Sequence, residues 1–136
     1  MKIAKTLAPM ILLLSVVAII LGPKRPAHAD LTTAGQREVS HLLDFLEKSN
    51  CEFNRNGTWY RDMKAVRAHA EQKQDYFAKK GKINSAEDFI ARAASKSEIS
   101  GSPYSVRCGD GPVQATSQWL TQELTRFRSE TKTAAR

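Results

Sequence analysis

The sequence has little of what marks a catalytic or metal-binding protein. It contains two cysteines in no Cys-x-x-Cys motif, three scattered histidines and no Gly-x-Ser-x-Gly motif. A redox-active pair usually lies close in sequence, a structural zinc site needs clustered ligands, and many serine hydrolases place their nucleophile in that glycine-rich turn. The sequence therefore predicts no catalytic residue, no metal site and no cofactor.

The chain also lacks the charge excess of a nucleic-acid-binding protein once its first 29 residues are set aside. It has 21 Lys and Arg residues against 14 Asp and Glu, a formal net charge of +7. Four of the basic residues lie in the first 29, which contain no acid, so the remainder has 17 basic residues against 14 acidic ones. A balance of +3 gives no reason to expect a nucleic-acid partner.

Residues 1–29 have the three parts of a secretory signal peptide. Two lysines precede an apolar run over residues 7–21, and Ala27-His28-Ala29 supplies the small residues that a signal peptidase reads. We expect cleavage after Ala29 and export to the periplasm, with the membrane touched only transiently through the leader. Retention as an uncleaved anchor is the alternative, because Lys24 and Arg25 are atypical so close to a cleavage site. The run is, however, shorter than the ~20 residues of a spanning helix.

The two cysteines, Cys51 and Cys108, are predicted to form a structural disulfide. An exported protein meets an oxidising compartment, in which such a pair normally closes. The bond would close a loop of roughly sixty residues and contribute about 4 kcal/mol at best by chain entropy. The sequence after residue 29 has thirteen Ile, Leu and Val residues and ten aromatic ones, a thin supply for a core, so this help is needed.

The hydrophobic pattern predicts about four helices. The first spans residues 31–49, with Thr33 and Gln36 at capping-box spacing. The second spans 63–79 after Asp62, the third opens at Ser85, and the last is capped by Thr116 or Ser117. We expect a single domain over residues 30–128 and a frayed basic tail over 129–136, which has no apolar residue larger than Ala.

Two segments read as strands. Residues 51–60 predict a hairpin, because Asn56-Gly57 is the strongest two-residue turn signal and both positions tolerate positive φ. Residues 103–108 alternate in the manner of a third strand. The predicted fold is α+β, with the helices packed on one face of a small antiparallel sheet formed by the hairpin and this later strand.

Three motifs resemble a known family, the YfeK-like proteins, which are short exported proteins of Gram-negative bacteria with a domain of unknown function. The motifs are Cys51-x-Phe53-x-Arg55-Asn56-Gly57-x-x-Tyr60, Ser85-Ala86-Glu87-Asp88-Phe89-Ile90 and Ser97-x-x-Ser100-Gly101-x-Pro103-Tyr104-x-Val106-x-Cys108. Ala68-His69 and Lys73 extend the likeness, which covers about residues 38–128. The resemblance implies export and an α+β fold, and it implies no reaction.

The hairpin supplies three candidate binding residues, Arg55, Asn56 and Tyr60. A guanidinium and loop amides at a hairpin tip can be presented to an anionic ligand. The alternative is a structural turn in which Arg55 pairs with an acid on a neighbouring helix.

The later loop supplies the other three candidates, Ser100, Gly101 and Tyr104. They would form a recognition loop with Tyr104 as an aromatic contact, and some periplasmic lysozyme inhibitors carry a similar Ser-Gly-x-x-Tyr loop. The alternative is a tight turn in which Gly101 supplies an unusual φ and Pro103 fixes the entry to the strand.

His69 is the one histidine within a family-like motif. A general base needs an oriented partner and a nucleophile or water, and no acid can be assigned to His69 from spacing. We expect it to pack within its helix.

These observations favour a non-enzymatic module that binds an envelope protein or an anionic glycan or lipid headgroup. The alternatives are a small periplasmic hydrolase or glycan-modifying enzyme using His69 with Arg55 or Ser100, and an inhibitor of a foreign lysozyme. An enzyme must bring His69, Arg55 and an acid or hydroxyl into one cleft, whereas a binding module can leave them scattered.

Overall fold

A computed structural model describes residues 30–136, so the predictions for residues 1–29 lie outside the described part of the chain. The elements in chain order are α1 (Thr33–Lys48), β1 (Glu52–Arg55), β2 (Thr58–Tyr60), α2 (Met63–Ala78), α3 (Ala86–Phe89), the π-helical turn η1 (Ile90–Ala94), β3 (Ser105–Arg107), β4 (Gln114–Ala115) and α4 (Thr116–Ala134).

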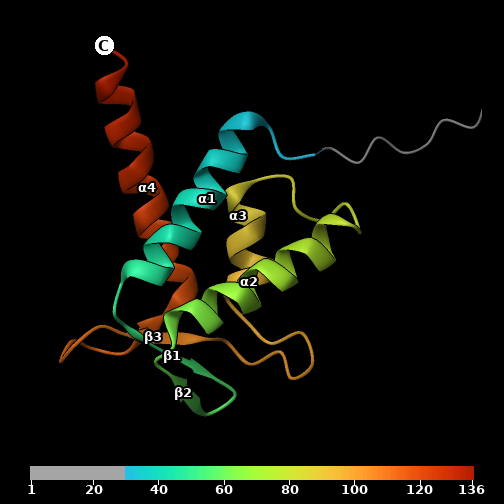
Figure 1. Ribbon diagram of the computed structural model, residues 1–136, viewed down its shortest axis with the longest axis vertical. Coiled ribbons are helices and arrows are strands. Elements are labelled where there is room, and N and C mark those ends of the chain that lie inside the picture. Colours follow the sequence, from blue (N-terminus) through green and yellow to red (C-terminus); the bar gives the residue numbers. More distant parts are fainter. Residues whose placement is uncertain (1–29) are drawn as a thin grey trace, which may run out of the picture.

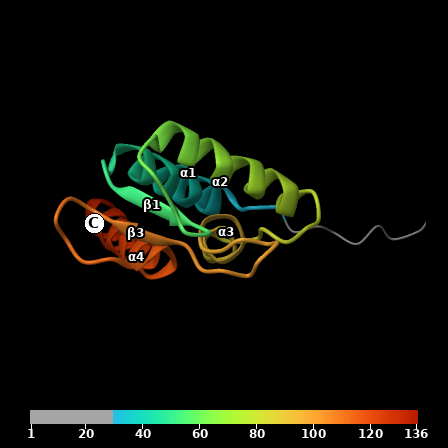
Figure 2. The ribbon, with the colours of Figure 1, turned by 90° about the horizontal axis from the view of Figure 1, so that it is seen from below.

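The helices lie on one side of a four-stranded antiparallel sheet with the order β2-β1-β3-β4. The sheet is at the lower end of Figure 1 with the helices above it, and the view from below in Figure 2 shows β1 and β3 in front of them. The predicted α+β fold is confirmed. None of the helices in residues 30–136 has the length and apolar character needed to cross a membrane.

The predicted hairpin is present, with β1 and β2 joined by Asn56 and Gly57. Both turn residues have positive φ, 51° and 87°, as a type I′ turn requires. The amide of Gly57 donates to Oδ1 of Asn54, which further fixes the turn. This geometry sets which side chains of β1 face the helices.

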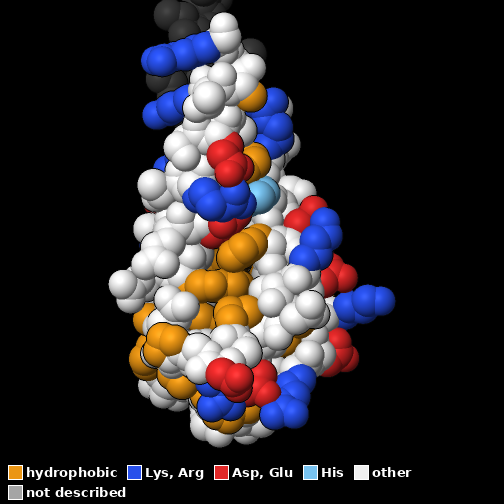
Figure 3. All heavy atoms as spheres, turned by 90° about the vertical axis from the view of Figure 1, so that its left-hand side faces the viewer, with side chains coloured by type: hydrophobic (Ala, Val, Ile, Leu, Met, Phe, Trp, Pro, Cys, Tyr) orange, Lys and Arg blue, Asp and Glu red, His pale blue; other side chains and the backbone are white. Residues whose placement is uncertain are grey.

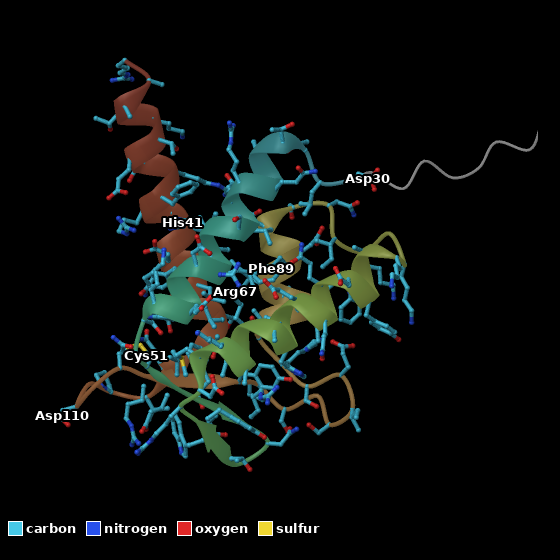
Figure 4. All side chains as sticks on the ribbon, viewed as in Figure 1. Asp30, His41, Cys51, Arg67, Phe89 and Asp110 are labelled. Atoms are coloured by element: carbon cyan, nitrogen blue, oxygen red, sulfur yellow. A yellow bond between two sulfur atoms is a disulfide. The ribbon has the colours of Figure 1, made fainter. Side chains whose placement is uncertain are left out.

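The Cys51–Cys108 disulfide joins the start of β1 to the end of β3 across a sequence separation of 57 residues. Glu52 lies opposite Arg107 in the register of these two strands, so the bond lies one step beyond the last strand pair. Figure 4 shows the sulfur pair beside the labelled Cys51. The predicted pairing is confirmed in the structure.

The core forms where the helices cover the inner face of the sheet. Phe53 and Val106, paired across β1 and β3, are buried together with apolar residues of α1, α3 and α4. The ring of Trp119 packs on Phe45 and Phe53, at centroid distances of 4.6 and 5.5 Å. Four apolar residues of α1 recur at helical spacing and are all buried, namely Val39, Leu42, Leu43 and Leu46.

Two helix starts differ from the predicted ones. Thr32, one residue before Thr33, caps α1 by accepting the amide of Gly35, and the Gln36 side chain reaches back to the carbonyl of Leu31. No side chain caps α4, since Ala115 occupies the cap position and Thr116 is already helical. The physical reason is the short strand β4, which the sequence pattern does not predict and which leads directly into α4.

Helix α4 continues to Ala134, into the segment expected to fray from residue 129. Arg128 forms ion pairs with Glu38 of α1 and Glu87 of α3, and Arg126 pairs with Glu130 one turn further on. These ion pairs stabilise α4 around residues 126–130, although residues 129–136 have no apolar residue larger than Ala.

The third helix changes geometry after one turn. Ser85 caps α3 by accepting the amide of Asp88, as predicted, but residues 90–94 continue as the π turn η1. The Ser95 hydroxyl then donates to the carbonyl of Ile90, which closes the turn. The chain leaves it into a loop that returns to β3 beside the hairpin tip.

Candidate functional site

A cleft of about 520 Å³ opens between the hairpin tip, α2 and the loop after η1. We call it the hairpin cleft. Each of the three segments contributes side chains to its lining, which comprises Arg55, Asn56, Thr58, Tyr60, His69, Gln72, Lys73, Tyr76, Phe77, Ser97, Glu98, Ile99 and Tyr104. Its volume falls within the range of roughly 300–1,000 Å³ typical of small-molecule sites.

Arg55 lies at the end of β1 on the same face of the sheet as the buried Phe53, two residues earlier. Its guanidinium carbon is 4.1 Å from the centre of the Tyr60 ring. Its Nε is buried and, among the described residues, has no hydrogen-bond partner. Arg55 takes part in none of the ion pairs found in residues 30–136, so the alternative in which it pairs with a helix acid is not found.

The wall formed by α2 carries His69 and Lys73, four residues apart and therefore on one helix face. Lys73 Nζ donates to the carbonyl of Lys96 and lies 5.2 Å from the centre of the Tyr104 ring. Burial lowers the pKa of Lys73 from its ordinary value, although the amine keeps a carbonyl acceptor. The side chain thus bridges α2 to the loop opposite it.

His69 is half-buried in the same wall. Burial lowers the pKa of its imidazole, and the nearby positive charges of Arg55 and Lys73 lower it further. In the part of the chain that the structure describes, its ring makes no side-chain hydrogen bond. A general base with no orienting partner is poorly prepared for proton transfer.

The third wall is the loop of residues 95–104, held by backbone hydrogen bonds across its neck. The amide of Tyr104 donates to Ser95 at 2.7 Å, that of Ser97 to Ser102 at 2.9 Å, and that of Gly101 to Ser97 at 2.9 Å. Gly101 has a φ of 70°, which confirms the unusual φ expected there. The loop is therefore a formed wall of the cleft.

The hairpin tip and this loop touch directly. The Ser100 hydroxyl lies 2.8 Å from Oδ1 of Asn56 and accepts the amide of Ser102. At the inner end of the loop, Tyr104 is buried, and its burial raises the pKa of the phenol. At the outer end, Ile99 is fully exposed, with a relative exposure of 101%.

The structure brings most of the predicted site residues together. Arg55, Asn56, Tyr60 and Tyr104 line the hairpin cleft, while Ser100 and Gly101 shape its loop wall without lining it. His69 lines the cleft too, so His69, Arg55, an acid (Glu98) and a hydroxyl (Ser97) share one cleft, as an enzyme would require. Within the described residues, however, the His69 ring lacks the orienting hydrogen bond that catalysis needs.

The contribution of α2 to the cleft was not predicted from the sequence, since neither Gln72 nor Lys73 was among the candidate site residues. The signal was present, because His69, Gln72, Lys73 and Tyr76 recur at helical spacing as a polar stripe with an aromatic. All four line the cleft.

A second polar cluster lies between α1 and α4, away from the cleft. Glu123 is buried and pairs with Arg126 and His41, whose ring stacks on Phe127 at a centroid distance of 4.0 Å. Figure 3 faces the left-hand side of Figure 1 and shows apolar side chains gathered there, with acidic and basic side chains above and below them. Arg67 of α2 pairs with Asp44 and Glu47 of α1 and with Glu71 of its own helix. These groups are satisfied within the chain.

No group of three potential metal ligands is found within residues 30–136. A family model described as a family of unknown function (DUF5329) matches residues 33–128. No curated protein and no solved structure matches the chain.

Proposed function

The chain belongs to the family of unknown function DUF5329, and from that premise we propose that it is a non-enzymatic binding protein of the bacterial periplasm whose hairpin cleft holds an anionic group. The YfeK-like identity and export with cleavage after Ala29 are parts of this proposal. The disulfide supports an oxidising compartment, because such bonds persist mainly in exported proteins.

The observation that carries the binding role is the state of Arg55. Its guanidinium is stacked on Tyr60, its Nε is buried without a partner, and no carboxylate of residues 30–136 neutralises it. The Arg55 side chain lines the cleft, so an anion bound there would neutralise its charge through charge-assisted hydrogen bonds to the terminal guanidinium nitrogens.

The charges around Arg55 support the same role. Lys73 adds a second cation and Glu98 one anion, so the lining has a net charge of +1 while His69 is neutral. Walls that remove water strengthen each of these interactions relative to bulk solvent. The cleft therefore favours ligands of negative charge.

A hydrolase using His69 is the second candidate, because the structure places His69, Arg55 and Glu98 in one cleft. The lack of a hydrogen bond to the His69 ring within the described residues argues against it. The lysozyme-inhibitor alternative is weakened by Ser100, whose hydroxyl is engaged by Asn56 and Ser102.

The proposal is tested by NMR titrations of the ¹⁵N-labelled exported protein with acetate, inorganic phosphate and vesicles containing phosphatidylglycerol. We expect saturable shifts confined to amides of the three cleft walls for at least one of these probes. Arg55→Gln should abolish them, whereas Arg61→Gln, an exposed arginine of the same hairpin that pairs with Glu52, should not. Binding of no probe, or equal binding by Arg55→Gln, would overturn the proposal.

The same samples separate binding from catalysis. Chromogenic ester and glycoside substrates should be left unchanged by the wild-type protein. Turnover that disappears in a folded His69→Ala variant would establish the hydrolase instead.

A further inference from the structure

The hairpin cleft combines one planar cation with a lining rich in hydroxyl and amide groups. Within the lining, the side chains of Asn56, Gln72, Thr58 and Ser97 can each both donate and accept hydrogen bonds. The hydroxyls of the three tyrosines do the same. A ligand that satisfies such a surface carries several groups that also donate and accept, and hydroxyl groups on a ring meet this requirement.

The walls also present apolar surface. The Tyr76 ring is 51% exposed, and Ile99 at the opposite rim is fully exposed. Tyr76 packs edge-on against Phe77, at a centroid distance of 5.1 Å, and Lys80 Nζ lies 4.0 Å from the centre of its ring, so a ligand packs on the face that Lys80 leaves open. The C–H face of a pyranose ring packs against aromatic and aliphatic side chains of this kind, while its hydroxyls point to the polar lining.

The charge pattern distinguishes a carboxylate from a phosphate. Arg55 lines the cleft with a planar guanidinium, whose two terminal nitrogens match the two oxygens of a carboxylate. Lys73 already gives one of its protons to the Lys96 carbonyl, and Glu98 repels a second negative charge. A net lining charge of +1 suits a monoanion better than a phosphate dianion.

From this lining we propose that the hairpin cleft binds a saccharide that carries a carboxylate. Arg55 pairs with the carboxylate, the amides and hydroxyls contact the ring hydroxyls, and Tyr76 packs on the ring. The volume of about 520 Å³ admits roughly one or two sugar rings. The inference rests on the proposed function and narrows the class of anion.

The test is calorimetry and saturation-transfer NMR on the exported protein with matched probes. Galacturonic acid and N-acetylmuramic acid carry both features, galactose has the ring alone, acetate the carboxylate alone, and galactose 1-phosphate a dianion. We expect one of the two acidic sugars to bind at least about tenfold more tightly than galactose, acetate and galactose 1-phosphate. An acetylated dipeptide with a free carboxylate is the comparison for a protein ligand.

Variants show which residue contacts the carboxylate of the ligand and which contacts its sugar ring. Arg55→Lys keeps the charge but loses the fork, and it should weaken acidic-sugar binding by about tenfold or more. Gln72→Ala, at an exposed position of α2, should weaken the sugar and leave acetate unchanged, while Arg61→Gln should change neither. Thermal unfolding midpoints show that each variant is folded.

The outcomes separate this inference from the proposed function. Arg55-dependent binding of acetate, phosphate or the dipeptide that equals or exceeds that of both acidic sugars would overturn the saccharide and leave an anion-binding cleft. Binding of no anion at all would overturn both. Equal affinity for galactose and galacturonic acid would show that Arg55 does not recognise the carboxylate.

Discussion

The Ser100 hydroxyl lies 2.8 Å from Oδ1 of Asn56, a contact between residues 44 positions apart that joins the loop wall of the cleft to the hairpin tip. Both residues were candidate ligand contacts in the sequence. In the structure they form a hydrogen bond with each other, and Asn56 occupies a turn position with a φ of 51°.

Replacement of Asn56 by Gly should separate these two walls while preserving the turn. Gly adopts positive φ without strain, so the free energy of unfolding should fall by no more than about 1 kcal/mol, the net contribution of one hydrogen bond. Amides of residues 97–102 should exchange faster with solvent, as measured by hydrogen exchange. Unchanged exchange there would show that the contact does not order the loop.

Replacement of Gly57 by Val should destabilise the protein by about 1–3 kcal/mol, because a β-branched residue is strained at positive φ. Gly57 has a φ of 87°, and nothing lies within 4 Å of an added Cβ, so the cost comes from the backbone. Gly57→Asn is the matched control and should cost less, since Asn tolerates this region. Chemical denaturation provides the comparison, and equal midpoints for Val and wild type would contradict the turn assignment.

Removal of the disulfide in a Cys51→Ser, Cys108→Ser double variant should cost up to about 4 kcal/mol, because the bond closes a loop of 57 residues. The measurement is the denaturation midpoint of the variant against the oxidised wild type. Thiol titration of the unreduced, denatured wild type should find no free thiol. Two reactive thiols per chain would refute the bond.

The leader should be absent from the exported protein. We expect the intact mass to correspond to a chain that begins at Asp30, because Ala27-His28-Ala29 precedes it. An N-terminus at Met1 would establish a retained anchor.

The pH dependence of anion binding should report on His69. Burial and the charges of Arg55 and Lys73 lower its pKa, so the ring is neutral at pH 7.5 and gains its proton only below its usual value of about 6.5. The protonated ring would add a positive charge beside Arg55 and Lys73 and offset Glu98. Affinity for a carboxylate ligand should therefore rise as the pH falls from 7.5 to 5.5, because the ligand stays ionised over that range.

A His69→Gln variant isolates this contribution. It should bind as the wild type does at pH 7.5 and lack the rise on acidification. The free energy of unfolding moves the other way: the unfolded chain binds the proton more readily, so wild-type stability is full above about pH 6.5 and declines as the pH falls through the lowered pKa of His69. Weaker binding by a stable His69→Gln protein at pH 7.5 would indicate a direct role in the ligand contact.

Local signals predicted the local structure of this protein well. Asn56-Gly57 predicted the turn and its positive φ values, Asp62 and Ser85 predicted two caps, and the apolar stripe of α1 predicted its buried face. Each of these features is decided by neighbours within a few residues. The sequence therefore carried enough information to place them.

The errors came where distant segments decide the outcome. Strand β4 is two residues long and exists because β3 offers Ser105 and Val106 as partners, and it moved the start of α4. The ion pairs that join Arg128 of α4 to two other helices could not be predicted from the sequence either. Among the described residues, no helix acid pairs with Arg55. The sequence could not decide this, since only the assembled fold shows which helix side chains reach the hairpin.

The π turn η1 makes the position of the loop wall sensitive to chain length. A π turn carries one residue more than the α-helical ladder needs, and such turns often occur at functional sites. Deletion of the exposed Ala91 would let an uninterrupted α-helix form and rotate Ser95 by about 100° around its axis. The Ser95 carbonyl would then point away from Tyr104, and Lys96 away from Lys73. A homologue one residue shorter in this turn would therefore have a different entrance to the cleft, even if every lining residue were identical.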